Sequence, residues 1–135
     1  MLNVGQFNKL KVLRKKPAGY YLDGTDDGIL LPARLAPPTL NEGDEVNAFI
    51  YHDSEGRLIA TTQKPLGVVG DIVLLKAVEI TPFGAFLDFG LMKDLLIPKA
   101  NMRSNMRRNG EYLVKIILDE KTGRLSATEY LESSL

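Results

Sequence analysis

Residues 81–98 read TPFGAFLDFGLMKDLLIP and carry two phenylalanines, Phe83 and Phe86, on either side of a glycine. In an extended chain successive side chains alternate between two faces, which places Phe86 on the outer face and its apolar neighbours on the core face. Strict alternation turns Phe83 inward, whereas a bulge at Gly84 brings both rings to the outer surface. Outward aromatic rings on a small sheet form a platform for nucleic-acid bases. The alternative is that both rings belong to the core.

An internal repeat organises the whole chain. Similar segments recur in the same order, with offsets that drift only from 65 to 67 residues. A period of this size, with several strands in each copy, indicates tandem small domains and not a solenoid. The matching segments are 17–23 with 82–88, 31–32 with 97–98, and 56–61 with 123–128.

Each copy is expected to contain five short strands separated by turn signals. Many short strands at even spacing are typical of barrels, which leave few exposed edges. The sequence therefore predicts an all-β chain of two tandem five-stranded OB barrels, at 1–64 and 65–135, joined by a short linker. The expected strands lie near 7–13, 20–23, 28–32, 45–51 and 58–62, and near 70–80, 85–89, 94–98, 112–118 and 124–128.

The charge composition is unusual for a protein dedicated to nucleic acid. The chain has 17 Lys plus Arg against 17 Asp plus Glu, so its net charge is zero, whereas such proteins usually show a basic excess. Any electrostatic footprint must therefore be local. There is no cysteine, which excludes disulfides and thiol chemistry. No stretch approaches the length of a membrane span, so we expect a cytoplasmic protein.

The run F-G-A-F-L-D-F-G at 83–90, followed by an apolar strand, resembles the signature of the S-one (S1) RNA-binding domain. This resemblance implies a five-stranded OB barrel that binds single-stranded RNA on the face carrying Phe83 and Phe86. It also implies that an Asp and an Arg of the last hairpin border that face, and Asp119 and Arg124 match them. The alternative for this pair is that Asp119 only shapes the turn while Arg124 is solvated.

A narrower resemblance rests on the proline that ends the third strand and on the G-R-L-x-A-T fifth strand. Two barrels with these features are similar to the bacterial conserved virulence factor B group, a family of RNA-binding proteins with several S-one barrels and a winged-helix domain. That resemblance implies that 135 residues are part of a longer natural chain. In S-one domains the third strand commonly ends in a histidine, where this chain has Pro98.

The connection at 99–110 carries four cations, which makes it the better candidate for phosphate contacts. Arg103 and Arg107 are spaced as on one side of a helix, so a short basic helix is predicted there. In a small barrel this segment is expected to lie near the two phenylalanines. The alternative is an ordinary solvated surface. The four cations are Lys99, Arg103, Arg107 and Arg108.

The first copy departs further from the family pattern. Ala18 stands where the first ring belongs, and only Tyr21 keeps the second ring. Asp53 and Arg57 retain the pair of the last turn. We expect this copy to be mainly structural, or to contribute Tyr21 and Arg57 to a weaker site.

No catalytic arrangement is visible in the sequence. His52 is the only histidine, and neither a nucleophile with a base nor a metal-ligand spacing exists, so no enzyme activity, metal or cofactor is predicted. The prediction is a non-enzymatic single-stranded RNA-binding protein that acts in post-transcriptional or translational regulation. Single-stranded DNA remains a possible partner, because no residue reports on a 2′-hydroxyl contact. The alternative is a protein-docking module built on OB folds.

Overall fold

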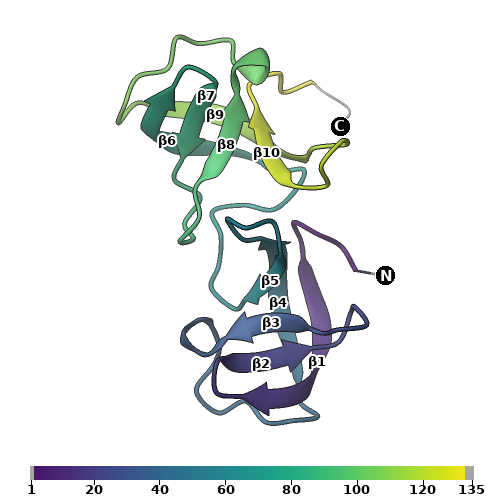
Figure 1. The fold of residues 1–135 in the computed structure, drawn as a ribbon. Helices are drawn as coiled ribbons and strands as arrows, with labels where there is room; N and C mark the ends of the chain where they lie inside the picture. The colour runs from purple at the N-terminus through teal and green to yellow at the C-terminus, as the bar shows by residue number, and fades with distance from the viewer. Residues whose placement is uncertain (1, 133–135) are drawn as a thin grey trace. The chain divides into compact units, whose positions relative to one another are not determined.

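A computed structural model describes residues 2–132 and divides the chain into two compact units, 1–64 and 65–135 (Figure 1). Each unit is a barrel-like sheet of five strands, and residues 2–132 contain no α-helix. The predicted all-β fold with two OB-like barrels is therefore confirmed. The first unit contains β1 (Phe7–Lys16), β2 (Gly19–Leu22), β3 (Ile29–Pro32), η1 (Ala33–Leu35), β4 (Glu45–His52) and β5 (Leu58–Thr61). The second contains β6 (Ile72–Thr81), β7 (Gly84–Leu87), β8 (Leu95–Pro98), η2 (Lys99–Asn101), β9 (Glu111–Leu118) and β10 (Leu125–Thr128).

The first unit is a closed barrel with the strand order β1-β2-β3-β5-β4. All neighbouring strands are antiparallel except β3 and β5, which run parallel and meet at Leu30 and Ile59. Closure pairs the backbone groups that an open sheet would expose at its edges. Much of the interior follows from period-two alternation, which turns apolar side chains of successive strands inward. Its members include Val12, Leu22, Ile29, Leu31, Val46, Ala48, Ile50 and Ala60.

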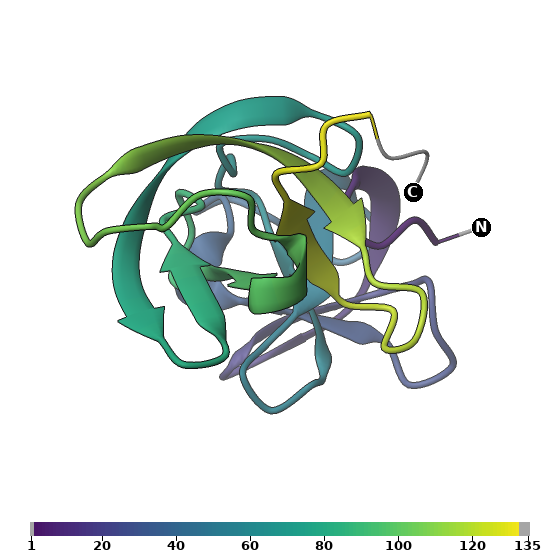
Figure 2. The same cartoon turned by 90° about the horizontal axis from the view of Figure 1, so that it is seen from above.

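The second unit has the order β10-β9-β6-β7-β8. Its longest strand, β6, pairs with β9 along one half and with β7 along the other, and Figure 2 shows the long curved arcs of β6 in teal and β9 in green. Among the described residues no backbone ladder joins β8 to β10. Polar side chains connect this end of the barrel instead. The Ser126 hydroxyl donates to the Leu96 carbonyl at 3.3 Å, and the Asn101 amide donates to the Ala127 carbonyl at 3.1 Å.

The irregularity of the β6–β7 hairpin lies in β6, where the register shifts between Ala77 and Glu79. The bulge predicted at Gly84 is therefore wrong, because the extra residue belongs to the partner strand. Gly84 has another role. Its φ is +153°, and a Cβ there would overlap the carbonyl oxygen of Ile97, so only glycine allows β7 and β8 to approach so closely. Gly19 has the same relation to β3 in the first barrel.

The helix predicted around Arg103 and Arg107 is also wrong. Only a short 3-10 turn forms, η2, and residues 102–110 contain no helix. Contacts with the barrel hold this connection in place. The Glu129 carboxylate accepts hydrogen bonds from the backbone N–H groups of Arg103 and Ser104 at 2.6 and 2.7 Å, and Met106 is buried. Tertiary contacts have therefore overridden a weak local preference.

Candidate nucleic-acid interface

Phe83 lies in the two-residue turn between β6 and β7, and its side chain is 81% exposed. The turn is fixed by the Thr81 hydroxyl, which accepts from the Phe83 N–H at 3.2 Å and donates to the Gly84 carbonyl at 3.0 Å. Exposure of an aromatic ring at this level has no packing explanation within the described chain. The turn, not a bulge in β7, brings the ring to the surface.

Phe86 lies in β7, three residues from Phe83, and is half-buried. Its partners across the sheet are Glu79 on β6 and Leu96 on β8. Directly paired residues of antiparallel strands share a face, so the ring is flanked by a carboxylate on one side and an exposed leucine on the other. The residues before and after it, Ala85 and Leu87, are fully buried, as the alternation predicted.

Lys99 is joined to the turn that carries Phe83 by a backbone hydrogen bond. Its N–H donates to the Phe83 carbonyl at 2.9 Å, and its side chain is exposed at the start of η2. Arg103 lies further along the same connection, with its guanidinium carbon 5.5 Å from the ring centroid of Tyr130. An Arg over an aromatic face forms a cation–π contact, and both groups remain exposed here.

Arg107 and Arg108 follow at the end of the connection. The Arg107 N–H donates to the Tyr112 hydroxyl at 2.7 Å, and its side chain is exposed. Arg108 lines an open pocket at the outer part of β6, together with Glu79 and Asp94. The four predicted cations are therefore not one cluster, since Lys99 lies beside Phe83 whereas Arg108 lies on the β6 side of Phe86.

The surroundings of Asp94 are acidic. Burial, followed by the charges of Asp88 and then Glu79, raises the pKa of the Asp94 carboxyl above its usual value. Three carboxylates, those of Asp94, Asp88 and Glu79, therefore lie near this end of the β7–β8 hairpin. A phosphate would be repelled here, and a hydrogen-bond donor or a cation would be favoured.

Asp119 shapes the β9–β10 turn. Its Oδ1 accepts from the N–H groups of Lys121 and Thr122 at 2.8 and 3.1 Å. Arg124 is exposed, and among the described residues no carboxylate lies within ion-pair distance of its guanidinium. The Asp therefore has the structural role that the sequence left open, while the Arg is available to a ligand.

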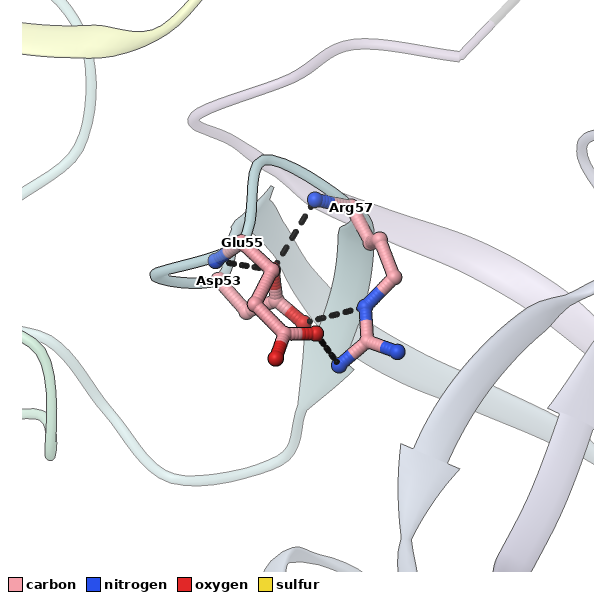
Figure 3. Close-up of polar contacts among 3 residues, drawn as sticks. All are labelled: Asp53, Glu55 and Arg57. Atoms are coloured by element: carbon pink, nitrogen blue, oxygen red, sulfur yellow. Dashed lines mark hydrogen bonds and ion pairs between the residues drawn. The ribbon is translucent and has the colours of Figure 1, made fainter.

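The corresponding turn of the first barrel is different (Figure 3). Arg57 donates from Nε to Asp53 at 3.0 Å and from Nη2 to Glu55 at 2.7 Å, so two carboxylates neutralise its charge. Burial opposes the charged form of Asp53, but the hydrogen bonds from Arg57 and Glu55 outweigh it and lower the pKa of the carboxyl. Arg57 is a poorer phosphate ligand than Arg124 for this reason.

Tyr21, the single ring kept in the first copy, is half-buried in β2. Its cross-strand partner is Arg14, whose guanidinium lies 5.3 Å from the ring centroid and donates to the Asp27 carbonyl at 3.1 Å. An Arg therefore covers the face on which a base would stack. Ala18, in the preceding turn, adds no aromatic surface.

Sequence reasoning missed several residues at this surface. Tyr130 follows the last strand and has no aromatic counterpart in the first copy, where Gln63 occupies the position. Glu79 was passed over because the bulge in β6 determines which face it occupies. Leu96 could have been found, since alternation between buried Leu95 and Ile97 turns it outward.

An exposed apolar group also lies on the ladder between β6 and β9. Leu74 and Leu113 are direct cross-strand partners and are 56% and 49% exposed. Ile72, on the same face of β6, is half exposed as well. In the first copy Lys9 and Asn47 pair at the matching positions, so the apolar surface is particular to the second barrel.

The comparisons with known proteins concern both barrels. A family model described as S1 domain matches residues 4–63, which are the first barrel. Residues 4–63 are therefore similar in sequence to S1 domains. The match lies in the first barrel, which has only one of the two aromatic residues of the family motif. The similarity of this barrel to the family therefore does not depend on the aromatic pair.

A curated relative is "Uncharacterized protein YitL" of Bacillus subtilis strain 168. It is 33% identical over 94 residues, which cover 69% of this chain and 32% of the relative. This chain therefore spans about a third of the length of that protein.

A solved structure with the same fold is described as a multidomain protein with nucleic acid binding domains from Streptococcus pneumoniae TIGR4. It superposes with a TM-score of 0.78 at 17% identity and covers 92% of this chain and 45% of that one. At this identity the likeness concerns the fold, and it includes both barrels.

Two further features bear on the kind of site. In the described part of the chain, no group of three or more His, Cys, Asp or Glu side chains is placed to hold a metal ion. Within the same residues no helix is long and apolar enough to cross a membrane.

Proposed function

We propose that this chain binds single-stranded RNA, without catalysis, through the Phe83–Phe86 hairpin of its second barrel. The observation that carries the proposal is the ring of Phe83, which is 81% exposed in a turn fixed by Thr81 and lies beside Lys99. Stacking of a base on such a ring contributes about 1–3 kcal/mol. Lys99 and the unpaired Arg124 then supply phosphate contacts.

The comparisons support a nucleic-acid-binding role at a coarser level. The first barrel is similar in sequence to S1 domains, and the solved structure with this fold is described as having nucleic acid binding domains. Within this proposal residues 65–135 form the binding domain and residues 1–64 mainly a structural one. The narrower assignment to the conserved virulence factor B group, a cytoplasmic location and a role in post-transcriptional or translational regulation are parts of the same proposal.

The test is a titration of labelled RNA and DNA homopolymers with the wild-type protein and the Phe83→Ala/Phe86→Ala variant. Loss of two stacking contacts should weaken binding by about a hundredfold. Affinity should fall with rising salt and with a small slope, because few phosphates are engaged. Undetectable binding of every homopolymer at low salt would overturn the proposal. Comparison of RNA with DNA then shows whether the 2′-hydroxyl contributes.

A second candidate is a protein-docking role, which the exposed Leu74–Leu113 pair and Ile72 favour. Contiguous apolar surface on a soluble domain marks interaction sites more often than chance exposure does. The two functions separate experimentally. A Leu74→Gln/Leu113→Gln variant should keep RNA affinity if the hairpin binds RNA, because the charge is unchanged and the altered side chains lie on the β6–β9 ladder and not on β7.

A further inference from the structure

The pocket beside β6 contains opposite charges that do not neutralise one another. It is lined by Val78, Glu79 and Ile80 from β6, by Asp94 from the β7–β8 connection, and by Arg108. No ion pair links the Arg108 guanidinium to either carboxylate. A carboxylate and a guanidinium that share a pocket without pairing leave donors and acceptors free for a ligand.

The pocket adjoins the proposed stacking surface. Glu79 is both a lining residue and the direct cross-strand partner of Phe86, so its carboxylate lies on the same face as the ring. A base stacked on Phe86 therefore has one edge toward Glu79. On its other side Phe86 pairs with Leu96, which offers no hydrogen bond to a base edge.

The charges here disfavour phosphate. Burial and then the nearby charges of Asp88 and Glu79 raise the pKa of the Asp94 carboxyl. An edge that donates hydrogen bonds is the part of a nucleotide that such a site accepts. The sugar–phosphate backbone is then expected on the side of Lys99.

Guanine is the base whose edges complement both kinds of charge. Its N1–H and N2–H₂ donors are adjacent and match the two oxygens of one carboxylate, whereas O6 and N7 are acceptors for a guanidinium. Adenine and cytosine offer an amino group without the second adjacent donor. Uracil presents a single donor, N3–H, between two carbonyl oxygens, so it can make only one bond to the carboxylate while a carbonyl oxygen faces the second carboxylate oxygen.

We propose that the Glu79–Arg108 pocket reads a guanine stacked on Phe86, so that the chain prefers single strands containing guanosine. Glu79 accepts from the Watson–Crick edge of the base, and Arg108 donates to O6 and N7. The proposal rests on the proposed binding at the hairpin and assigns a base preference to that site. Glu79 and Arg108 are specificity-determining residues in it.

The experiment uses the full 135-residue chain and labelled uridine octamers in which one central base is guanine, hypoxanthine, adenine or uracil. Wild type should bind the guanine octamer roughly tenfold more tightly than the uracil octamer, since one good bidentate contact discriminates by about that factor. Hypoxanthine, which lacks only the 2-amino group, should lie between them. Because these four octamers test the wild-type protein, the readout does not depend on the folding of a variant.

Glu79→Gln should abolish most of the guanine preference while it leaves affinity for the uracil octamer unchanged or improved, because a negative charge has been removed. Glu45→Gln is the matched control, since it removes one exposed carboxylate from a strand of the other barrel and should alter neither affinity. Equal binding of all four octamers by wild type, or an equal effect of Glu79→Gln on each, would overturn the base preference alone. Failure of every octamer to bind would overturn the binding site itself.

Discussion

The two barrels have the same backbone plan but different chemistry at corresponding positions. In the first, Arg14 covers the ring of Tyr21, and Arg57 is neutralised by Asp53 and Glu55. In the second, the position of Arg14 is taken by Glu79, so no guanidinium covers Phe86. The two copies therefore share one scaffold, but an arginine covers the aromatic ring in the first copy and no arginine does so in the second.

The largest expected effect is on stability, at the two glycines where neighbouring strands approach closely. Gly84→Ala places a Cβ against the carbonyl oxygen of Ile97, and Gly19→Ala does the same against that of Leu31. Each change should destabilise its own barrel by about 2–4 kcal/mol, since neither neighbouring backbone can move freely. Thermal melting followed by circular dichroism, with amide exchange to locate the affected unit, gives the answer. Gly43→Ala, where a Cβ meets nothing within 4 Å, controls for backbone strain alone because its φ is also positive. A harmless Gly84→Ala would show that the two barrels do not share this constraint.

The next effect concerns the rings. Phe86→Ala should weaken binding of a single-stranded RNA by roughly tenfold, whereas Tyr21→Ala should change it less than twofold, because Arg14 already covers the tyrosine. Fluorescence anisotropy with one labelled strand measures both. Equal losses in the two variants would show that both barrels bind RNA in the same way.

A gain-of-function change sharpens the same contrast. Ala18→Phe restores a ring in the exposed turn of the first barrel, at the position that Phe83 occupies in the second. We expect a modest rise in RNA affinity, about two- to fivefold, since one ring is added while Tyr21 stays covered. The double variant Ala18→Phe/Arg14→Gln should gain more, because the guanidinium no longer covers Tyr21 and no carboxylate is introduced. No gain in either variant would mean that the scaffold of the first barrel lacks more than its rings.

The smallest expected effect is a difference between the two barrels in how their stability responds to acid, at the residue that follows the last strand of each. Burial raises the pKa of the Glu129 carboxyl, but hydrogen bonds from Ser104 and Arg103 outweigh it, so the net pKa is lowered from 4.5. Its contribution to stability is therefore complete above about pH 4.5 and is lost as pH falls through the lower, folded-state value. Glu129→Gln should melt below wild type at pH 7, and the gap should close in acid.

The first barrel has Thr62 at the position of Glu129, and its hydroxyl donates to the Leu35 carbonyl at 2.6 Å. That contact does not titrate, so Thr62→Val should lower the melting temperature by an amount that is the same at every pH. A constant gap between Glu129→Gln and wild type across the acid range would contradict the assignment.

Much of the fold could be predicted because it follows from local rules. Alternation identified Ala85 and Leu87 as core residues, and the repeat located five strands in each copy within a few residues of their observed ends. Turn signals such as that at Asp53 marked the hairpins correctly.

The errors arose where two distant segments decide the outcome. The bulge lies in β6 rather than at Gly84 because register depends on both strands of a pair, and a motif read in one strand cannot assign it. The helix expected around Arg103 is absent because Glu129, 26 residues away, binds its N–H. The Glu79–Arg108 pocket joins residues with no sequence pattern between them, so only the folded chain reveals it.

The side-chain closure between β8 and β10 has a consequence for motion. Where β3 and β5 are joined by backbone pairing, the second barrel is closed by the Ser126 hydroxyl, the Asn101 amide and the bonds of Glu129 to residues 101–104. Most of these bonds come from side chains rather than from a backbone ladder, so we expect local opening of the second barrel to begin here. Because β8 also pairs with β7, movement of β8 would change the shape of the sheet that carries Phe86. If the hairpin binds RNA as proposed, local opening here would let the surface around Phe86 adjust to the bound strand.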